Sequence, residues 1–125
     1  MNVENQIDYW RKGATEDFEV AELLIEKGRF LHGLFFCHLV MEKILKTHVV
    51  KTSKQLAPKS HNLIYLSERS GLSIQDENLN FFGILMKYQL EGRYPDYKPY
   101  IPEKKLVKSY LKETQKVLLW LKAKL

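Results

Sequence analysis

Apolar residues recur at steps of three and four along most of the chain, the spacing of one face of an α-helix. Near the N-terminus this face holds Ile7, Ala14, Phe18 and Ile25. No stretch of four or more residues shows the alternation of a half-buried strand. The pattern therefore predicts an all-α protein.

Breaks in the helical pattern divide the chain into four long helices and one short helix. They are expected at residues 4–27, 30–51, 61–70, 75–91 and about 102–124. Gly28, Gly71 and Gly92 suit helix ends, and Ser60 suits the cap of the short helix. Short loops between long helices favour an antiparallel up-and-down bundle. A three-helix core with a swapped arm is the alternative, and residues 1–125 have the length of a single domain.

The most apolar helix, around Phe35–Val50, carries a stripe of three polar residues. His38, Glu42 and Lys46 follow one another at intervals of four, so their side chains share one helix face. Glu42 and Lys46 could form an ordinary ion pair beside a satisfied histidine. Alternatively, the stripe lines a polar pocket in which Glu42 orients a ligand or acts as a base. Gly33, near the start of the same helix, could mark a close approach of two helices.

Charge is distributed unevenly along the chain, whose formal net charge is +5. Residues 1–27 hold seven acids and three bases, whereas residues 98–125 hold eight lysines and two glutamates. Both terminal helices could simply present solvated charged faces. The basic one could instead form a surface for an acidic partner or nucleic acid.

Several functional classes find no support in the sequence. The single cysteine, Cys37, lies among aromatic residues and is predicted to be a buried thiol, not a nucleophile. No apolar run approaches the ~18 residues that span a bilayer. The first ten residues lack the apolar segment of a secretion signal, so we expect a cytoplasmic protein with no membrane association. Zinc-type spacings such as HExxH and CxxC are absent, so we predict neither a metal nor another cofactor.

Two further sets of polar residues lie at junctions between loops and helices. His61 follows a polar loop that contains Pro58, and it is expected to open the short helix. Arg93 and Asp96 lie in a proline- and tyrosine-rich loop that cannot be helical. Each residue could be structural, as a cap or a salt bridge. Together they could bind an anion, because an arginine can hold a phosphate or carboxylate through two parallel hydrogen bonds.

The order of these segments resembles the HEPN family of small helical bundles, over essentially the whole chain. The residues that carry the resemblance are Asp17, the Glu-Lys-x-x-Lys of Glu42, Lys43 and Lys46, His61-Asn62-Leu63, and Arg93-Tyr94-Pro95-Asp96. The resemblance implies an all-α protein that is commonly dimeric and, in prokaryotes, associated with a small separate nucleotidyltransferase. It also implies a proposed capacity to bind nucleotides. The predicted nucleotide- or partner-binding residues are His38, Glu42, Lys46, His61, Arg93 and Asp96.

Many members of this family are metal-independent ribonucleases, including toxins of toxin–antitoxin pairs, and use an Arg-x4–6-His motif across a dimer interface. This chain departs from that pattern, because Arg29 is three residues before His32 and nine before His38. In the toxin branch a tyrosine follows the histidine by two residues, but no tyrosine stands two residues after His61. The resemblance therefore favours a protein without catalytic residues, with no enzymatic activity of the standard kind.

Three functions remain as hypotheses. The first is a homodimeric module that binds a nucleotide or a nucleotidyltransferase. The second is a ribonuclease with a non-standard site, in which His61 or His38 is the base and Arg93 stabilises the phosphorane. The third is a purely structural dimeric partner. The dimer itself is predicted from the fifteen aromatic residues, which exceed what one small bundle can bury.

Overall fold

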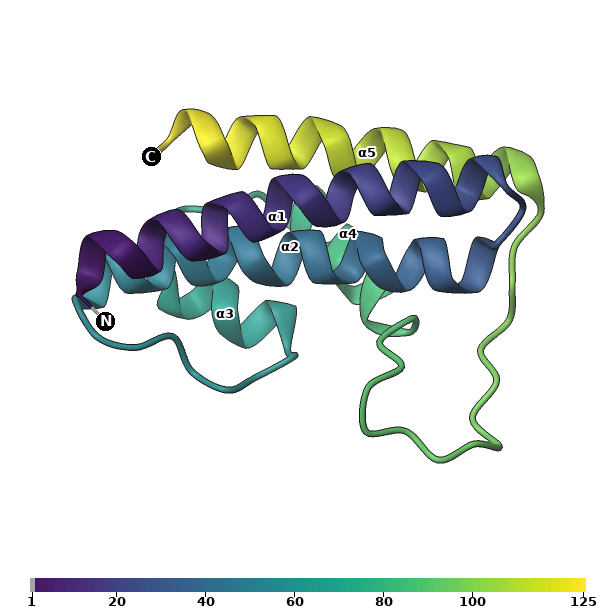
Figure 1. Cartoon of the computed structure of the whole chain (residues 1–125), viewed down its shortest axis with the longest axis horizontal. Coiled ribbons are helices and arrows are strands. Elements are labelled where there is room, and N and C mark those ends of the chain that lie inside the picture. Colours follow the sequence, from purple (N-terminus) through teal and green to yellow (C-terminus); the bar gives the residue numbers. More distant parts are fainter. Residues whose placement is uncertain (1) are drawn as a thin grey trace.

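The computed structural model describes residues 2–125 and confirms an all-helical bundle (Figure 1). Its helices are α1 (Val3–Glu26), α2 (Phe30–Ser53), α3 (Leu63–Arg69), α4 (Asp76–Met86) and α5 (Lys104–Ala123). No strand occurs among the described residues. No helix in this part of the chain is long and apolar enough to cross a membrane.

Helix α2 is the centre of the fold and packs against all four other helices. Figure 1 shows α1 antiparallel to α2, with α5 lying beside them and running in the direction of α2. In this view the short α3 lies below α2, and α4 passes behind α2. Helix α2 is apolar on most of its circumference, as a helix enclosed by neighbours should be.

The turn between α1 and α2 brings these two helices unusually close. Gly28 adopts the left-handed conformation with φ of 79°, as predicted for a residue that follows a helix. One turn into α2, a Cβ atom on Gly33 would lie 2.5 Å from Cγ1 of Ile25. The absence of a side chain at Gly33 is therefore what allows α1 to pack against the start of α2.

We expect Gly33→Ala to lower the free energy of unfolding, by about 1–3 kcal/mol, because the added methyl overlaps Ile25. This is the reverse of the usual preference for alanine in a helix, which is worth roughly 1 kcal/mol. Gly83 is the matched control, since nothing lies within 4 Å of a Cβ placed there. Gly83→Ala should stabilise α4. Urea denaturation of both variants measures the sign of each change in the free energy of unfolding. A Gly33→Ala variant more stable than the wild type would refute the close approach of α1 and α2.

Helix α4 is shorter than predicted, since it ends at Met86 and not near residue 91. The backbone N–H groups of Lys87 and Tyr88 bond to carbonyls three residues back, which tightens the last turn. The buried Tyr88 then donates its hydroxyl to the carbonyl of Tyr100, at 3.1 Å. This contact with the following loop holds the chain outside a helix. Gly92, at φ of 77°, therefore lies in a loop turn, not at a helix end.

Helix α3 also begins later than predicted. Its cap is Asn62, whose side chain accepts hydrogen bonds from the N–H groups of Ile64 and Tyr65. Ser60 instead accepts a hydrogen bond from the N–H of Asn62, at 3.1 Å, one step before the cap. The prediction that Ser60 caps α3 and that His61 opens it was wrong. His61 precedes the helix in an extended segment, which turns its side chain toward α2.

Candidate functional site

Glu42 is the centre of a polar network inside the bundle. Its Oε2 accepts a hydrogen bond from Nζ of Lys46 at 3.0 Å, and its Oε1 accepts one from Nδ1 of His61 at 2.9 Å. Nδ1 of His38 lies 3.8 Å from the same Oε1. Glu42 and Lys46 are both buried, so the polar stripe of α2 faces inward. A carboxylate and an ammonium at such depth are stable only when paired.

His38 forms the closed end of this network. Its ring is fully buried, and Nε2 lies 3.0 Å from the carbonyl oxygen of His61. A carbonyl only accepts, so Nε2 must carry the proton that is donated. Burial lowers the pKa of His38 to about 4, although the nearby Glu42 carboxylate opposes the change. His38 is therefore neutral at pH 7, and it fixes the position of the His61 backbone.

His61 forms the open end of the network, because 45% of its side chain is exposed. With Nδ1 donating to Glu42, its Nε2 faces outward and lies 3.6 Å from Oε2 of Glu91. Glu91 had not been predicted as a site residue. No sequence pattern could single it out, since the predicted continuation of α4 through residue 91 concealed its position in the loop.

Lys46 is the second place at which the network approaches the surface. Its ammonium lies 5.0 Å from the centre of the Trp10 ring on α1, in a cation–π contact. One turn away, Lys43 pairs with Asp17 of α1 at 2.7 Å. Both lysines of the Glu-Lys-x-x-Lys pattern therefore join α2 to α1, through an aromatic ring and a carboxylate respectively.

Arg93 and Asp96 lie in the loop after α4, and no contact joins them to the network among the described residues. The guanidinium of Arg93 lies 4.1 Å from the centre of the Tyr97 ring, and its Nε donates to the carbonyl of Gln89. Gly92–Tyr94 and Asp96–Lys98 line an open hollow of about 580 Å³. The structure thus brings four of the six predicted residues together. The other two lie further along the loop that carries Glu91, and no hydrogen bond or ion pair among the described residues joins their side chains to the network.

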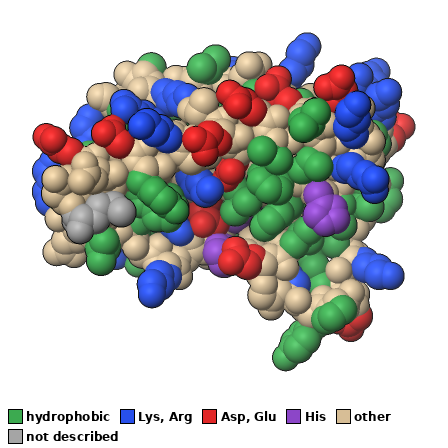
Figure 2. Space-filling view, in the orientation of Figure 1, with side chains coloured by type: hydrophobic (Ala, Val, Ile, Leu, Met, Phe, Trp, Pro, Cys, Tyr) green, Lys and Arg blue, Asp and Glu red, His purple; other side chains and the backbone are tan. Residues whose placement is uncertain are grey.

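That loop projects from the helices, and hydrophobic side chains protrude from its tip (Figures 1 and 2). Tyr94 and Tyr100 are each 83% exposed. The loop is nevertheless anchored, because the hydroxyl of Tyr97 donates to the carbonyl of Lys87 at 2.6 Å. The loop therefore exposes Arg93 and two tyrosines to solvent, while the Tyr97 hydrogen bond holds its backbone in place.

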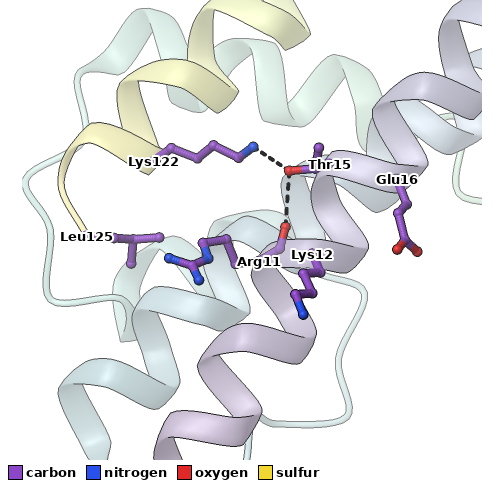
Figure 3. Close-up of a pocket in the computed structure, with 6 residues that line it drawn as sticks. All are labelled: Arg11, Lys12, Thr15, Glu16, Lys122 and Leu125. Carbon is purple, nitrogen blue, oxygen red and sulfur yellow. Dashed lines mark hydrogen bonds between the residues drawn. The ribbon is translucent and has the colours of Figure 1, made fainter.

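A further hollow, of about 390 Å³, lies between α1 and α5 and is mainly cationic (Figure 3). Its lining residues are Arg11, Lys12, Thr15, Glu16, Lys122 and Leu125. Lys122 donates to the hydroxyl of Thr15, and Glu16 points away from the other side chains (Figure 3). The sequence did not predict this hollow, because its residues come from opposite ends of the chain. Arg11 is already paired with Asp8 at 2.8 Å.

Neither a reactive cysteine nor a group of metal ligands is found among residues 2–125. Cys37 is buried as predicted, and burial raises the pKa of its thiol to about 12, so it is no nucleophile at neutral pH. Across residues 2–125, no group of three or more histidine, cysteine and carboxylate side chains is arranged to hold a metal ion.

Comparison with known proteins agrees with the arrangement of these helices. The model of the HEPN domain matches residues 7–124, and the chain belongs to this family. A crystal structure with the same fold is that of TT1696 from Thermus thermophilus. It has a TM-score of 0.79 and 20% sequence identity, and the alignment covers 100% of both chains. The search of curated proteins gave no match.

Proposed function

We propose that this HEPN-domain protein is a non-catalytic module that binds a nucleotide and acts with a small nucleotidyltransferase. The observation that carries the proposal is the placement of the network. Two groups near the surface, the Lys46 ammonium and the His61 imidazole, are bonded to the same carboxylate of Glu42. They are therefore held a few ångströms apart at fixed positions, and a rigid site loses less entropy when it binds a small ligand.

Each group in this arrangement suits one part of a nucleotide. The Lys46 ammonium is the cation for a phosphate. The exposed Nε2 of His61 and the carboxylate of Glu91, 3.6 Å apart, suit the hydroxyl groups of a ribose. His38 and Glu42 position these groups from inside the bundle, and we assign them no contact with the ligand.

Arg93 and Asp96 are assigned to partner binding, because they belong to the projecting loop and not to the network. Tyrosine and arginine are enriched among the residues that dominate binding energy at protein interfaces. Tyr94 lines the hollow beside Arg93, and Tyr100, further along the same loop, is equally exposed. The partner is a nucleotidyltransferase or a second copy of this chain.

ATP binding measured by calorimetry tests the nucleotide part of the proposal. We expect His61→Asn to weaken binding about tenfold, since the asparagine amide can still donate to Glu42 but lacks the outward nitrogen. Arg93→Ala should leave ATP binding unchanged and should reduce co-elution with a nucleotidyltransferase from the neighbouring reading frame. Arg69→Ala is the matched control, because Arg69 also lies over a tyrosine ring, that of Tyr65, on another surface. Absence of ATP binding by the wild-type protein would refute the nucleotide-binding proposal.

One observation favours a second candidate, a metal-independent ribonuclease. A carboxylate bonded to one nitrogen of an imidazole, with the other nitrogen facing outward, is the geometry that prepares a histidine to act as a general base. Glu42 and His61 have this geometry. RNA cleavage that persists in EDTA and disappears in His61→Asn would support this candidate over the binding module.

A further inference from the structure

A groove of about 430 Å³ lies beside the network, between the first turns of α1 and the loop that follows α2. Its lining residues are Gln6, Tyr9, Trp10, Lys46, Leu56, Ala57, Pro58 and Lys59. The volume is within the range of small-molecule sites. Lys46 belongs both to this groove and to the network, so the groove adjoins the site proposed above.

The walls of the groove are aromatic and aliphatic, and they are open to solvent. Leu56 is 74% exposed and Tyr9 is 55% exposed, which is unusual for side chains of their size in a folded chain. The Tyr9 and Trp10 rings meet edge to face, with their centres 4.9 Å apart. A flat ring could pack on such walls, as nucleobases pack on aromatic side chains in many proteins.

The charged side chains that line the groove are all cationic. Two of its eight lining residues are lysines, Lys46 and Lys59, and none is acidic. Lys46 is only 5% exposed, yet an ammonium has three N–H donors and, within residues 2–125, only Glu42 accepts from it. A buried cation with donors to spare, at the edge of an apolar groove, favours a ligand that combines an apolar body with an anion.

We infer that the groove binds the ring of a nucleoside phosphate, with the phosphate between Lys46 and Lys59. The inference rests on the proposed function and adds where the base lies and which residues contact it. Tyr9, Trp10, Leu56 and Pro58 enclose the ring. A ligand needs a ring to pack on the apolar walls and an anion to pair with the lysines, and a nucleoside phosphate has both.

Tryptophan fluorescence can locate the ligand, because the chain has only two tryptophans, Trp10 and Trp120. In a Trp120→Phe protein, whose signal comes from Trp10, ATP should quench the emission in a saturable way. Adenosine and tripolyphosphate should each bind at least about tenfold more weakly than ATP. Saturable ATP binding in calorimetry with no change in Trp10 emission would place the nucleotide elsewhere and overturn the inference, while leaving the proposed function intact.

Two surface substitutions test the groove without disturbing the core. Leu56→Asp and Lys59→Glu should each weaken ATP binding about tenfold. The first puts a charged group against the ring, and the second puts negative charge beside the phosphate. Leu119→Asp on α5 is the matched control, because Leu119 is also exposed but lies outside the groove. Equal affinities in Leu56→Asp and Leu119→Asp would exclude the groove as the site. If the wild-type protein does not bind ATP at all, both the proposed function and this inference are overturned.

Discussion

Replacing Glu42 with alanine is expected to lower the free energy of unfolding by about 3–5 kcal/mol, the usual cost of leaving a buried charge without its partner. The Lys46 ammonium would lose its only hydrogen-bond acceptor among the described residues, and His61 would lose the bond that orients it. A domain of this size is stable by about 5–15 kcal/mol in total. The substitution should therefore move the urea midpoint to much lower concentration.

Two comparisons separate this effect from a general sensitivity to mutation. Asp8→Ala removes the carboxylate of the exposed pair with Arg11 and should change stability by less than about 1 kcal/mol. The double variant Glu42→Leu, Lys46→Met should recover most of the loss, because apolar residues can replace a buried ion pair at little cost. If Glu42→Ala is no more destabilising than Asp8→Ala, the network does not support the fold.

The second large effect expected is on the pH dependence of stability, through His38. Burial lowers the pKa of His38 to about 4 in the folded protein, against an ordinary value of 6.5. Between these values the unfolded chain binds a proton that the folded chain does not, so stability rises with pH across this window. The contribution of His38 is complete above pH 6.5. About 3 kcal/mol is lost as the pH falls to about 4.

Urea titrations at several pH values between about 4.5 and 7.5 measure this slope. His38→Gln should flatten it, because the glutamine amide can donate to the His61 carbonyl but does not titrate. His32→Gln, at an exposed histidine, controls for the loss of a histidine from the chain. Some slope should remain in His38→Gln, since burial also lowers the pKa of His48. An unchanged slope in His38→Gln would mean that His38 titrates as it does in the unfolded chain.

The sequence was most informative where local periodicity and tertiary packing agree. That His38, Glu42 and Lys46 share one face of α2 follows from spacing alone, because residues four apart lie on one side of a helix whatever surrounds them. The close approach of two helices at Gly33 was also predicted from the sequence. It is confirmed by the 2.5 Å that would separate a Cβ atom at Gly33 from Cγ1 of Ile25. The all-helical class of the fold can likewise be predicted from the local spacing of apolar residues alone.

The sequence was less informative where contacts distant in the chain decide the structure. Helical spacing continues past Met86, but the bond from Tyr88 to the loop carbonyl of Tyr100 ends α4 there. For the same reason Arg93 lies apart from the network, since its position depends on how that loop is tied. Trp10 falls at the helical spacing of the apolar face of α1, between Ile7 and Ala14, so the sequence alone gives it no role but packing. Its role beside Lys46 becomes visible only when α1 and α2 are placed side by side.

The sharing of one carboxylate has a thermodynamic consequence. Lys46 and His61 each bond to a different oxygen of Glu42, so an anion that draws Lys46 toward the groove leaves more of the carboxylate charge for His61. Linkage of this kind is reciprocal, so a ligand group that bonds to His61 must alter the anion affinity at Lys46 by the same factor. Through Glu42, any anion bound in the groove would therefore be coupled to any ligand group bound at the exposed histidine.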